Sequence, residues 1–181
     1  MTTRLPVLLT APALLMASAV TWLAPSFSVS AVSLAAQVEL PVLDVAEYHA
    51  PYVAIWLQDS NKNVTNLALW YDLDMRNDEG LQWLKDIRQW WRRSGRNMSF
   101  PIDGVSGATR KAGTYTLNFE SLKAHLAALP AGDYQFVVEA AREVGGRELV
   151  SIEFTLPLSS PLQLSGQGHT ELAGISLTVS P

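Results

Sequence analysis

The chain has 181 residues, of which 48% are hydrophobic and 17% charged, a composition that suits a globular domain with a substantial core. It contains no cysteine, which excludes disulfides, thiolate nucleophiles and cysteine-bound cofactors. The net charge is −4 without long runs of one sign, so no nucleic acid partner is predicted.

The first residues of the chain have the sequence pattern of an export signal. Arg4 is the one charged residue among the first 36, and the apolar run Leu5–Ala24 follows it. Small residues then gather around Ala31 and Ala35, and signal peptidase requires small residues of this kind before its cut. The order of charged start, apolar stretch and small-residue end is that of a secretory signal peptide.

We therefore expect residues 1–35 to be a cleavable signal peptide and residues 36–181 to form one exported domain. Cleavage is predicted after Ala31 or Ala35. The alternative is an uncleaved anchor helix, because the apolar run is just long enough to span a bilayer. Proline residues within that run favour removal.

The exported part opens with strands. A first strand is expected near 38–40. Residues 52–58 and 66–71 are rich in aliphatic and aromatic side chains and flank the polar segment 59–63. This composition predicts a β-hairpin.

One amphipathic helix is predicted over Gly80–Arg93. Its apolar stripe consists of Trp83, Leu84, Ile87, Trp90 and Trp91. Asp78 suits the N-cap position and Gly95 the C-terminal cap. The direct interpretation is that the tryptophans bury this helix against the sheet.

The segment 103–109, Asp-Gly-Val-Ser-Gly-Ala-Thr, is the most specific motif of the chain. It resembles the heptad that bacterial flavin transferases modify, which implies FMN linked through its phosphate to the Thr109 hydroxyl. A transferase needs an acceptor on a slender, protruding loop. Gly107 and Ala108 allow close approach to the backbone, and Ser106 holds the turn.

The cofactor-binding residues assigned here are Asp103, Gly104, Ser106, Gly107, Ala108, Thr109 and Arg110. Asp103 is expected to cap the loop amides or to orient the hydroxyl. The alternative interpretation of the motif is a plain surface turn built by Asp-Gly and Ser-Gly.

Basic residues bracket the heptad, since seven of the thirteen Lys and Arg fall between Lys85 and Lys111. Arg110 is expected to pair with the flavin phosphodiester, because guanidinium groups match phosphate oxygens. The alternative is a solvated basic face. A bound flavin also gives the helix a second interpretation, in which one tryptophan stacks on the isoalloxazine ring.

The rest of the chain alternates apolar and polar residues with period two. The strands expected there are 115–119, 134–140, 150–156 and 175–179. Two of them share an entry phrase, Ala-Gly-x-Tyr, in which the tyrosine packs at the strand start. About seven strands in total predict a mainly β fold, an immunoglobulin-like antiparallel β-sandwich with one inserted amphipathic helix.

Further phrases resemble the bacterial periplasmic domain-of-unknown-function family 2271. They are residues 47–56, 90–93, 129–134 and 139–143, and with the heptad they span nearly all of the exported part. The resemblance implies a periplasmic protein that is flavinylated and serves as partner of PepSY-type membrane flavoreductases. It carries over Asp103 and residues 106–109 as the attachment motif.

The function predicted is a periplasmic electron relay. A separate flavin transferase, using FAD and magnesium, would place FMN on Thr109 and release AMP, and a membrane reductase would supply electrons. The flavin performs the chemistry, so we predict an electron carrier rather than a stand-alone enzyme and assign no catalytic residue. His49, His125 and His169 are far apart in sequence, and no metal site is predicted.

The alternative function is a non-catalytic periplasmic binding or assembly module. Exposed aromatic side chains near Trp56 and Trp70 would favour that alternative, because aromatic faces stack on sugars and peptides. Burial of both tryptophans would weaken it.

Overall fold

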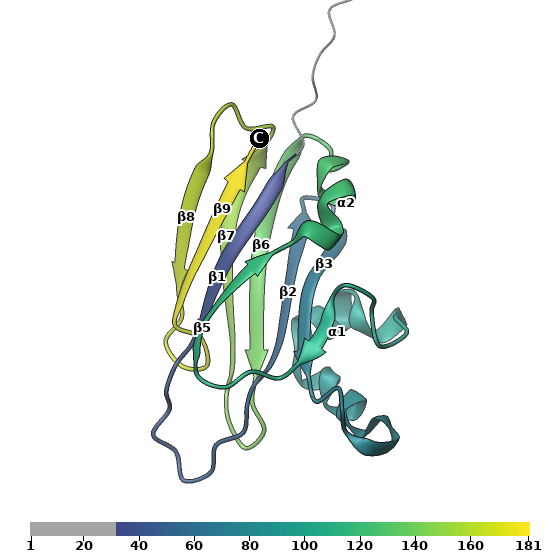
Figure 1. Cartoon of the computed structure of the whole chain (residues 1–181), viewed down its shortest axis with the longest axis vertical. Coiled ribbons are helices and arrows are strands. Elements are labelled where there is room, and N and C mark those ends of the chain that lie inside the picture. Colours follow the sequence, from purple (N-terminus) through teal and green to yellow (C-terminus); the bar gives the residue numbers. More distant parts are fainter. Residues whose placement is uncertain (1–31) are drawn as a thin grey trace, which may run out of the picture.

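The computed structural model describes residues 32–181. Residues 1–31, most of the predicted signal peptide, therefore lie outside the described residues. The described residues form two β-sheets packed face to face, with short helices along one side (Figure 1). The strands are β1 (Ser33–Leu40), β2 (Tyr52–Asp59), β3 (Val64–Tyr71), β4 (Ser106–Ala108), β5 (Gly113–Asn118), β6 (Gly132–Ala141), β7 (Arg147–Leu156), β8 (Leu162–Gln167) and β9 (Gly174–Ser180).

The four-stranded sheet has the order β5-β1-β9-β8 and is antiparallel throughout. In β1, the buried residues Leu34, Ala36 and Val38 alternate with more exposed ones, as expected for a strand with one face on the core. β1 begins at Ser33, earlier than predicted, because Leu34 already packs in the interior. The expected domain boundary at residue 36 therefore falls inside a strand.

The five-stranded sheet has the order β4-β3-β2-β6-β7, and β2 at its centre is covered on both faces. Every residue of β2 from Tyr52 to Gln58 is buried. Val53, Ile55 and Leu57 point into the sandwich interior. Tyr52, Ala54 and Trp56 belong to a second apolar cluster on the outer face of this sheet.

A helical segment builds the cover over that outer face (Figure 1). It consists of η1 (Arg76–Asp86), α1 (Arg88–Arg93) and η2 (Gly95–Asn97). Leu84, Ile87 and Trp90 are each at most 1% exposed within the outer cluster. A second short segment, η3 (Glu120–Leu122) and α2 (Lys123–Ala127), adds Leu126 to the sandwich interior.

The prediction of one continuous helix over Gly80–Arg93 is wrong. η1 is a 3-10 helix, and Ile87, with ψ of 74°, separates it from α1. Asp78 is not an N-cap, because its φ is 56° and it lies within the kinked start of η1. The start of α1 is instead held by the Glu139 carboxylate on β6, which accepts the backbone N–H of Gln89 at 3.0 Å and that of Trp90 at 2.8 Å.

The prediction of a mainly β sandwich is confirmed, with nine strands rather than about seven. The two strands that sequence analysis missed are β4 and β8. The order β3-β2-β6-β7 corresponds to strands C′-C-F-G of a variable-type immunoglobulin domain, and the pair β1–β5 corresponds to B–E. The C-terminal hairpin β8–β9 lies on the other side of β1, where immunoglobulin domains place strand A.

The shared Ala-Gly-x-Tyr phrase forms the same structure twice. The Tyr134 hydroxyl donates to the Pro130 carbonyl at 2.8 Å, and the Tyr115 hydroxyl donates to the Lys111 carbonyl at 2.7 Å. The glycines that precede them, Gly113 and Gly132, have φ of 151° and 153°, a conformation that other residues rarely adopt. At the start of β6 this arrangement is the tyrosine corner of immunoglobulin-like sandwiches.

Candidate functional site

The heptad 103–109 folds as a tight turn that leads into an edge strand. The backbone N–H of Ser106 donates to the Ile102 carbonyl at 2.9 Å, and the Ser106 hydroxyl accepts the Ile102 N–H, also at 2.9 Å. Gly104 lies inside this turn with φ of 68°, where a side chain would be strained. Ser106 thus holds the turn, as predicted.

The expectation of a protruding loop is wrong for the second half of the heptad. Residues 106–108 form β4, which pairs in parallel with the end of β3. The pairing satisfies backbone groups that a free loop would leave to water, and it fixes the position of the following residue. Ala108 nevertheless remains exposed, and Gly107 and Thr109 are partly exposed.

Parallel pairing brings Thr109 beside the residue that follows β3. The Thr109 N–H continues the ladder by donating to the Tyr71 carbonyl at 3.1 Å. The Thr109 hydroxyl then donates to Oδ1 of Asp72 at 2.9 Å. Orientation of this hydroxyl was one of the two roles expected for Asp103, but Asp103 is exposed in the turn and Asp72 makes the contact. Asp72 carries no sequence signal, because only the β3–β4 register brings it here.

Gly107 does not need to be a glycine for the packing of this domain. It lies opposite Trp70, and a Cβ built on it would be 3.7 Å from the nearest atom of that ring, an ordinary contact distance. Its φ is not in the left-handed region either. The fold therefore does not require a glycine here. The absence of a side chain leaves the backbone of β4 accessible at the exposed edge of the sheet.

Arg110 packs on aromatic rings. Its guanidinium carbon lies 4.2 Å from the ring centroid of Trp70 and 4.8 Å from that of Tyr115. Such stacking fixes the guanidinium and leaves its N–H edge able to bind an anion. Pairing of Arg110 with a phosphodiester on the adjacent Thr109 stays a prediction.

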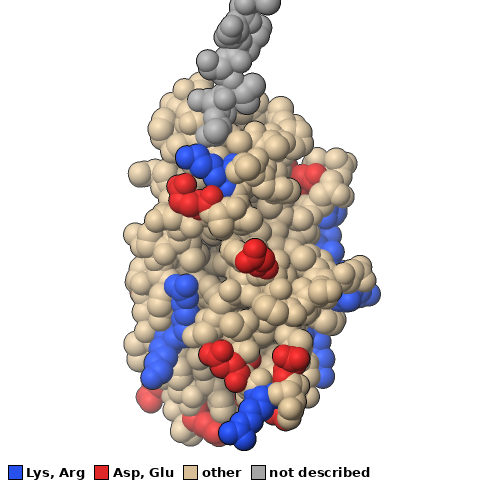
Figure 2. Space-filling model, turned by 45° about the vertical axis from the view of Figure 1, so that its right-hand side comes forward, with Lys and Arg blue, Asp and Glu red and all other residues tan. Residues whose placement is uncertain are grey.

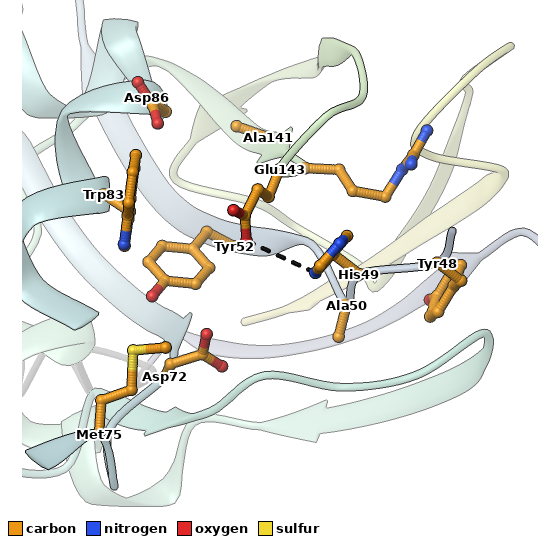
Figure 3. A pocket seen from close by; sticks show the side chains of 11 residues that line it. Tyr48, His49, Ala50, Tyr52, Asp72, Met75, Trp83, Asp86, Ala141 and Glu143 are labelled. Atoms are coloured by element: carbon orange, nitrogen blue, oxygen red, sulfur yellow. Dashed lines mark ion pairs between the residues drawn. The ribbon is translucent and has the colours of Figure 1, made fainter. Parts of the chain in front are cut away.

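A cleft of about 270 Å³ opens at the same end of the five-stranded sheet, where β2 begins and β3 and β6 end. Residues that line it include Tyr48, His49, Tyr52, Asp72, Met75 and Trp83. Figure 3 shows Trp83 and Met75 on one side, His49 and Tyr48 on the other, and Tyr52 and Asp72 between them. Asp72 is therefore shared between the cleft and the Thr109 hydroxyl.

The polar groups of the cleft are held by specific partners. His49 lies 3.1 Å from Glu47 and 3.5 Å from Glu143, which connects the segment before β2 with the β6–β7 turn. Arg142 is engaged in a buried ion pair with Glu171, at 2.9 Å.

The phenol of Tyr52 lies at the floor of the cleft and donates to the Gly80 carbonyl at 3.1 Å. Burial raises the pKa of Tyr52 well above its ordinary value, and the negative charge of Asp72 acts in the same direction. The phenol therefore stays protonated and serves as a hydrogen-bond donor.

In residues 32–181, three tryptophans are buried, Trp91 is half-buried and Trp83 is exposed. Trp56 and Trp70 are 0% and 2% exposed, so these two side chains offer no stacking face to a ligand, which weakens the main argument for a binding module. Trp90 is buried under the helical segment, as the direct interpretation of that segment predicts. Trp83 is different, because it is 39% exposed and lines the cleft.

The charged surface is mixed. On the face in Figure 2, Lys and Arg side chains alternate with Asp and Glu, and wide uncharged areas separate them. Among residues 32–181, no cluster of His, Asp and Glu has the arrangement of a metal site. Within the same residues, none of the helices has the length and apolar character of a membrane span.

The comparison with family models identifies the chain. Residues 33–174 match the model of the family DUF2271, described as a predicted periplasmic protein. The match begins at the first residue of β1 and ends at the first residue of β9, so it covers the heptad, the whole five-stranded sheet and the other sheet except for most of β9. No match is found among the curated proteins or among the solved structures. The chain belongs to the DUF2271 family of predicted periplasmic proteins.

Proposed function

We propose that this protein is a periplasmic electron carrier whose FMN is attached through a phosphoester to Thr109. The observation that carries the proposal is the hydrogen bond of 2.9 Å from the Thr109 hydroxyl to Asp72 Oδ1 at a partly exposed sheet edge. A bound FMN supplies reversible one- and two-electron transfer.

The contact with Asp72 suits a hydroxyl that acts as nucleophile. During attachment the Thr109 Oγ forms a bond to the phosphorus of the FMN half of FAD, and the pyrophosphate bond breaks with release of AMP. The hydroxyl proton leaves along the existing hydrogen bond, with the Asp72 carboxylate as its first acceptor. A separate flavin transferase supplies FAD and magnesium for this step.

Gly107 gives independent support. The fold has no need of a glycine at this position, since a side chain would fit beside Trp70 without strain. A small residue is required if another protein must bring its active site against the backbone of β4. The exposed Ala108 next to Thr109 serves the same approach.

The residues around the acceptor fit a tethered phosphate. Arg110 follows Thr109 directly, and its guanidinium is pre-positioned by Trp70 and Tyr115. Lys111 is exposed next to it. Covalent attachment would keep the cofactor at high local concentration outside the cytoplasm. A membrane flavoreductase of the PepSY type is the proposed electron donor.

The test is the intact mass of the denatured protein after co-expression with a bacterial flavin transferase. We expect a mass increase of one FMN less water in the wild type and in Thr114→Ala, which changes an exposed threonine on β5. Thr109→Ala should show no increase, and Asp72→Asn should be modified more slowly while remaining folded. An unmodified wild type, with the transferase active on another acceptor protein, would refute the proposal.

A further inference from the structure

We infer that the cleft between Trp83 and Tyr48 receives the isoalloxazine ring of a flavin tethered at Thr109. This inference rests on the proposed function and assigns ring contacts that the heptad does not contain. The cleft and the acceptor are adjacent, because Asp72 contacts the Thr109 hydroxyl and also lines the cleft. A flexible ribityl chain leads from the phosphate to the ring, so a ring bound in this cleft needs no rearrangement of β4.

Several of the exposed apolar side chains of the domain line this cleft. Seven large hydrophobic residues are exposed in residues 32–181, and three of them line it: Tyr48 at 38%, Met75 at 43% and Trp83 at 39%. Isolated exposed apolar residues need no explanation, but their convergence on one concave site indicates a ligand. Two aromatic rings and a thioether are suited to a flat aromatic ring system.

The charged residues of the site favour different positions for the phosphate and for the ring of the cofactor. Asp72, Asp86 and Glu143 line the cleft, while its one arginine is engaged with Glu171. This acidic lining disfavours a phosphate inside the cleft but not an uncharged ring. The guanidinium of Arg110 lies instead over Trp70, a ring of the sandwich interior. The site therefore places the phosphate outside the cleft and the ring inside.

The size of the cleft agrees with a partly exposed ring. Its volume of about 270 Å³ lies just below the range of about 300–1,000 Å³ that is usual for sites enclosing a whole small molecule. A ring bound there keeps one edge at the surface, which direct electron exchange with a partner protein requires.

The inference is tested by the fluorescence of the attached flavin, because stacking on tryptophan or tyrosine quenches flavin emission. The protein is co-expressed with a flavin transferase, and intact mass gives the extent of attachment for each variant. Trp83→Ala and Tyr48→Ala remove ring contacts, while Trp83→Phe keeps an aromatic face. Val42→Ala is the matched control, since Val42 is 89% exposed and does not line the cleft.

We expect weak flavin emission in the wild type, in Trp83→Phe and in Val42→Ala, and a several-fold increase in Trp83→Ala and Tyr48→Ala at equal attachment. Emission equal to that of free FMN in the fully modified wild type would overturn the inference, as would unchanged emission in both alanine variants. These results would leave the attachment at Thr109 intact. A wild type without added mass would refute both proposals.

Discussion

Replacement of Glu139 by alanine is the sharpest test of how the helical segment is held on the sheet. The Glu139 side chain is 0% exposed and accepts the backbone N–H groups of Gln89 and Trp90 at the start of α1. It also accepts a bond of 2.8 Å from Arg147. No residue of the helical segment supplies this cap, so the alanine variant leaves the two N–H groups without an acceptor.

The structure sets the size of the effect. An unsatisfied, largely buried donor costs about 1–3 kcal/mol, so the two N–H groups that lose this cap together give a loss of about 3 kcal/mol in the free energy of unfolding. Arg147 is 41% exposed and regains water, so its contribution is small. For a domain of this size the melting temperature should fall by roughly 2–4 °C for each kcal/mol, or about 6–12 °C.

Urea unfolding followed by tryptophan fluorescence measures this loss, and circular dichroism gives the melting temperature. Glu153→Ala is the control, because Glu153 is exposed on β7 and accepts a single side-chain bond from Gln135. That variant should stay within about 0.5 kcal/mol of the wild type. If Glu139→Ala also stays within that range, the Glu139 carboxylate does not hold α1 on the sheet.

Two further predictions concern acid stability and signal processing. Burial raises the pKa of the Glu148 carboxyl, but hydrogen bonds outweigh this effect and lower the pKa below its ordinary value of 4.5. The carboxylate accepts these bonds from the backbone N–H groups of His169, Thr170 and Leu172. A lowered pKa stabilises the fold above pH 4.5, and this contribution is lost as the pH falls through the folded-state pKa. Urea midpoints measured down a pH series should therefore fall less steeply below pH 4.5 in Glu148→Gln than in the wild type; parallel curves would contradict this. We also expect signal cleavage after Ala31, because cleavage after Ala35 would remove the buried Leu34 from β1. N-terminal sequencing of the exported protein measures the cleavage site, and a sequence that starts at Ala36 would contradict this prediction.

Alternation of apolar and polar residues was sufficient to predict most of the strands and the sandwich. It failed where a strand has no such pattern. β4 has the sequence Ser-Gly-Ala and forms only because the exposed edge of β3 accepts it. The spacing of tryptophans predicted a helical segment under which Trp90 is buried, but it did not predict the break at Ile87, since the start of α1 is fixed by a carboxylate from β6.

The sequence by itself determined the heptad 103–109, the period-two strands and the absence of cysteine, because each of these can be read without knowing which distant residues meet. Only the tertiary structure decided what surrounds Thr109. The parallel β3–β4 register, a contact between residues 37 positions apart, places Asp72 at its hydroxyl. The same end of the sheet joins Tyr48, Tyr52, Met75 and Trp83 into one cleft. Local patterns do not specify such contacts, since they depend on how distant strands and loops meet.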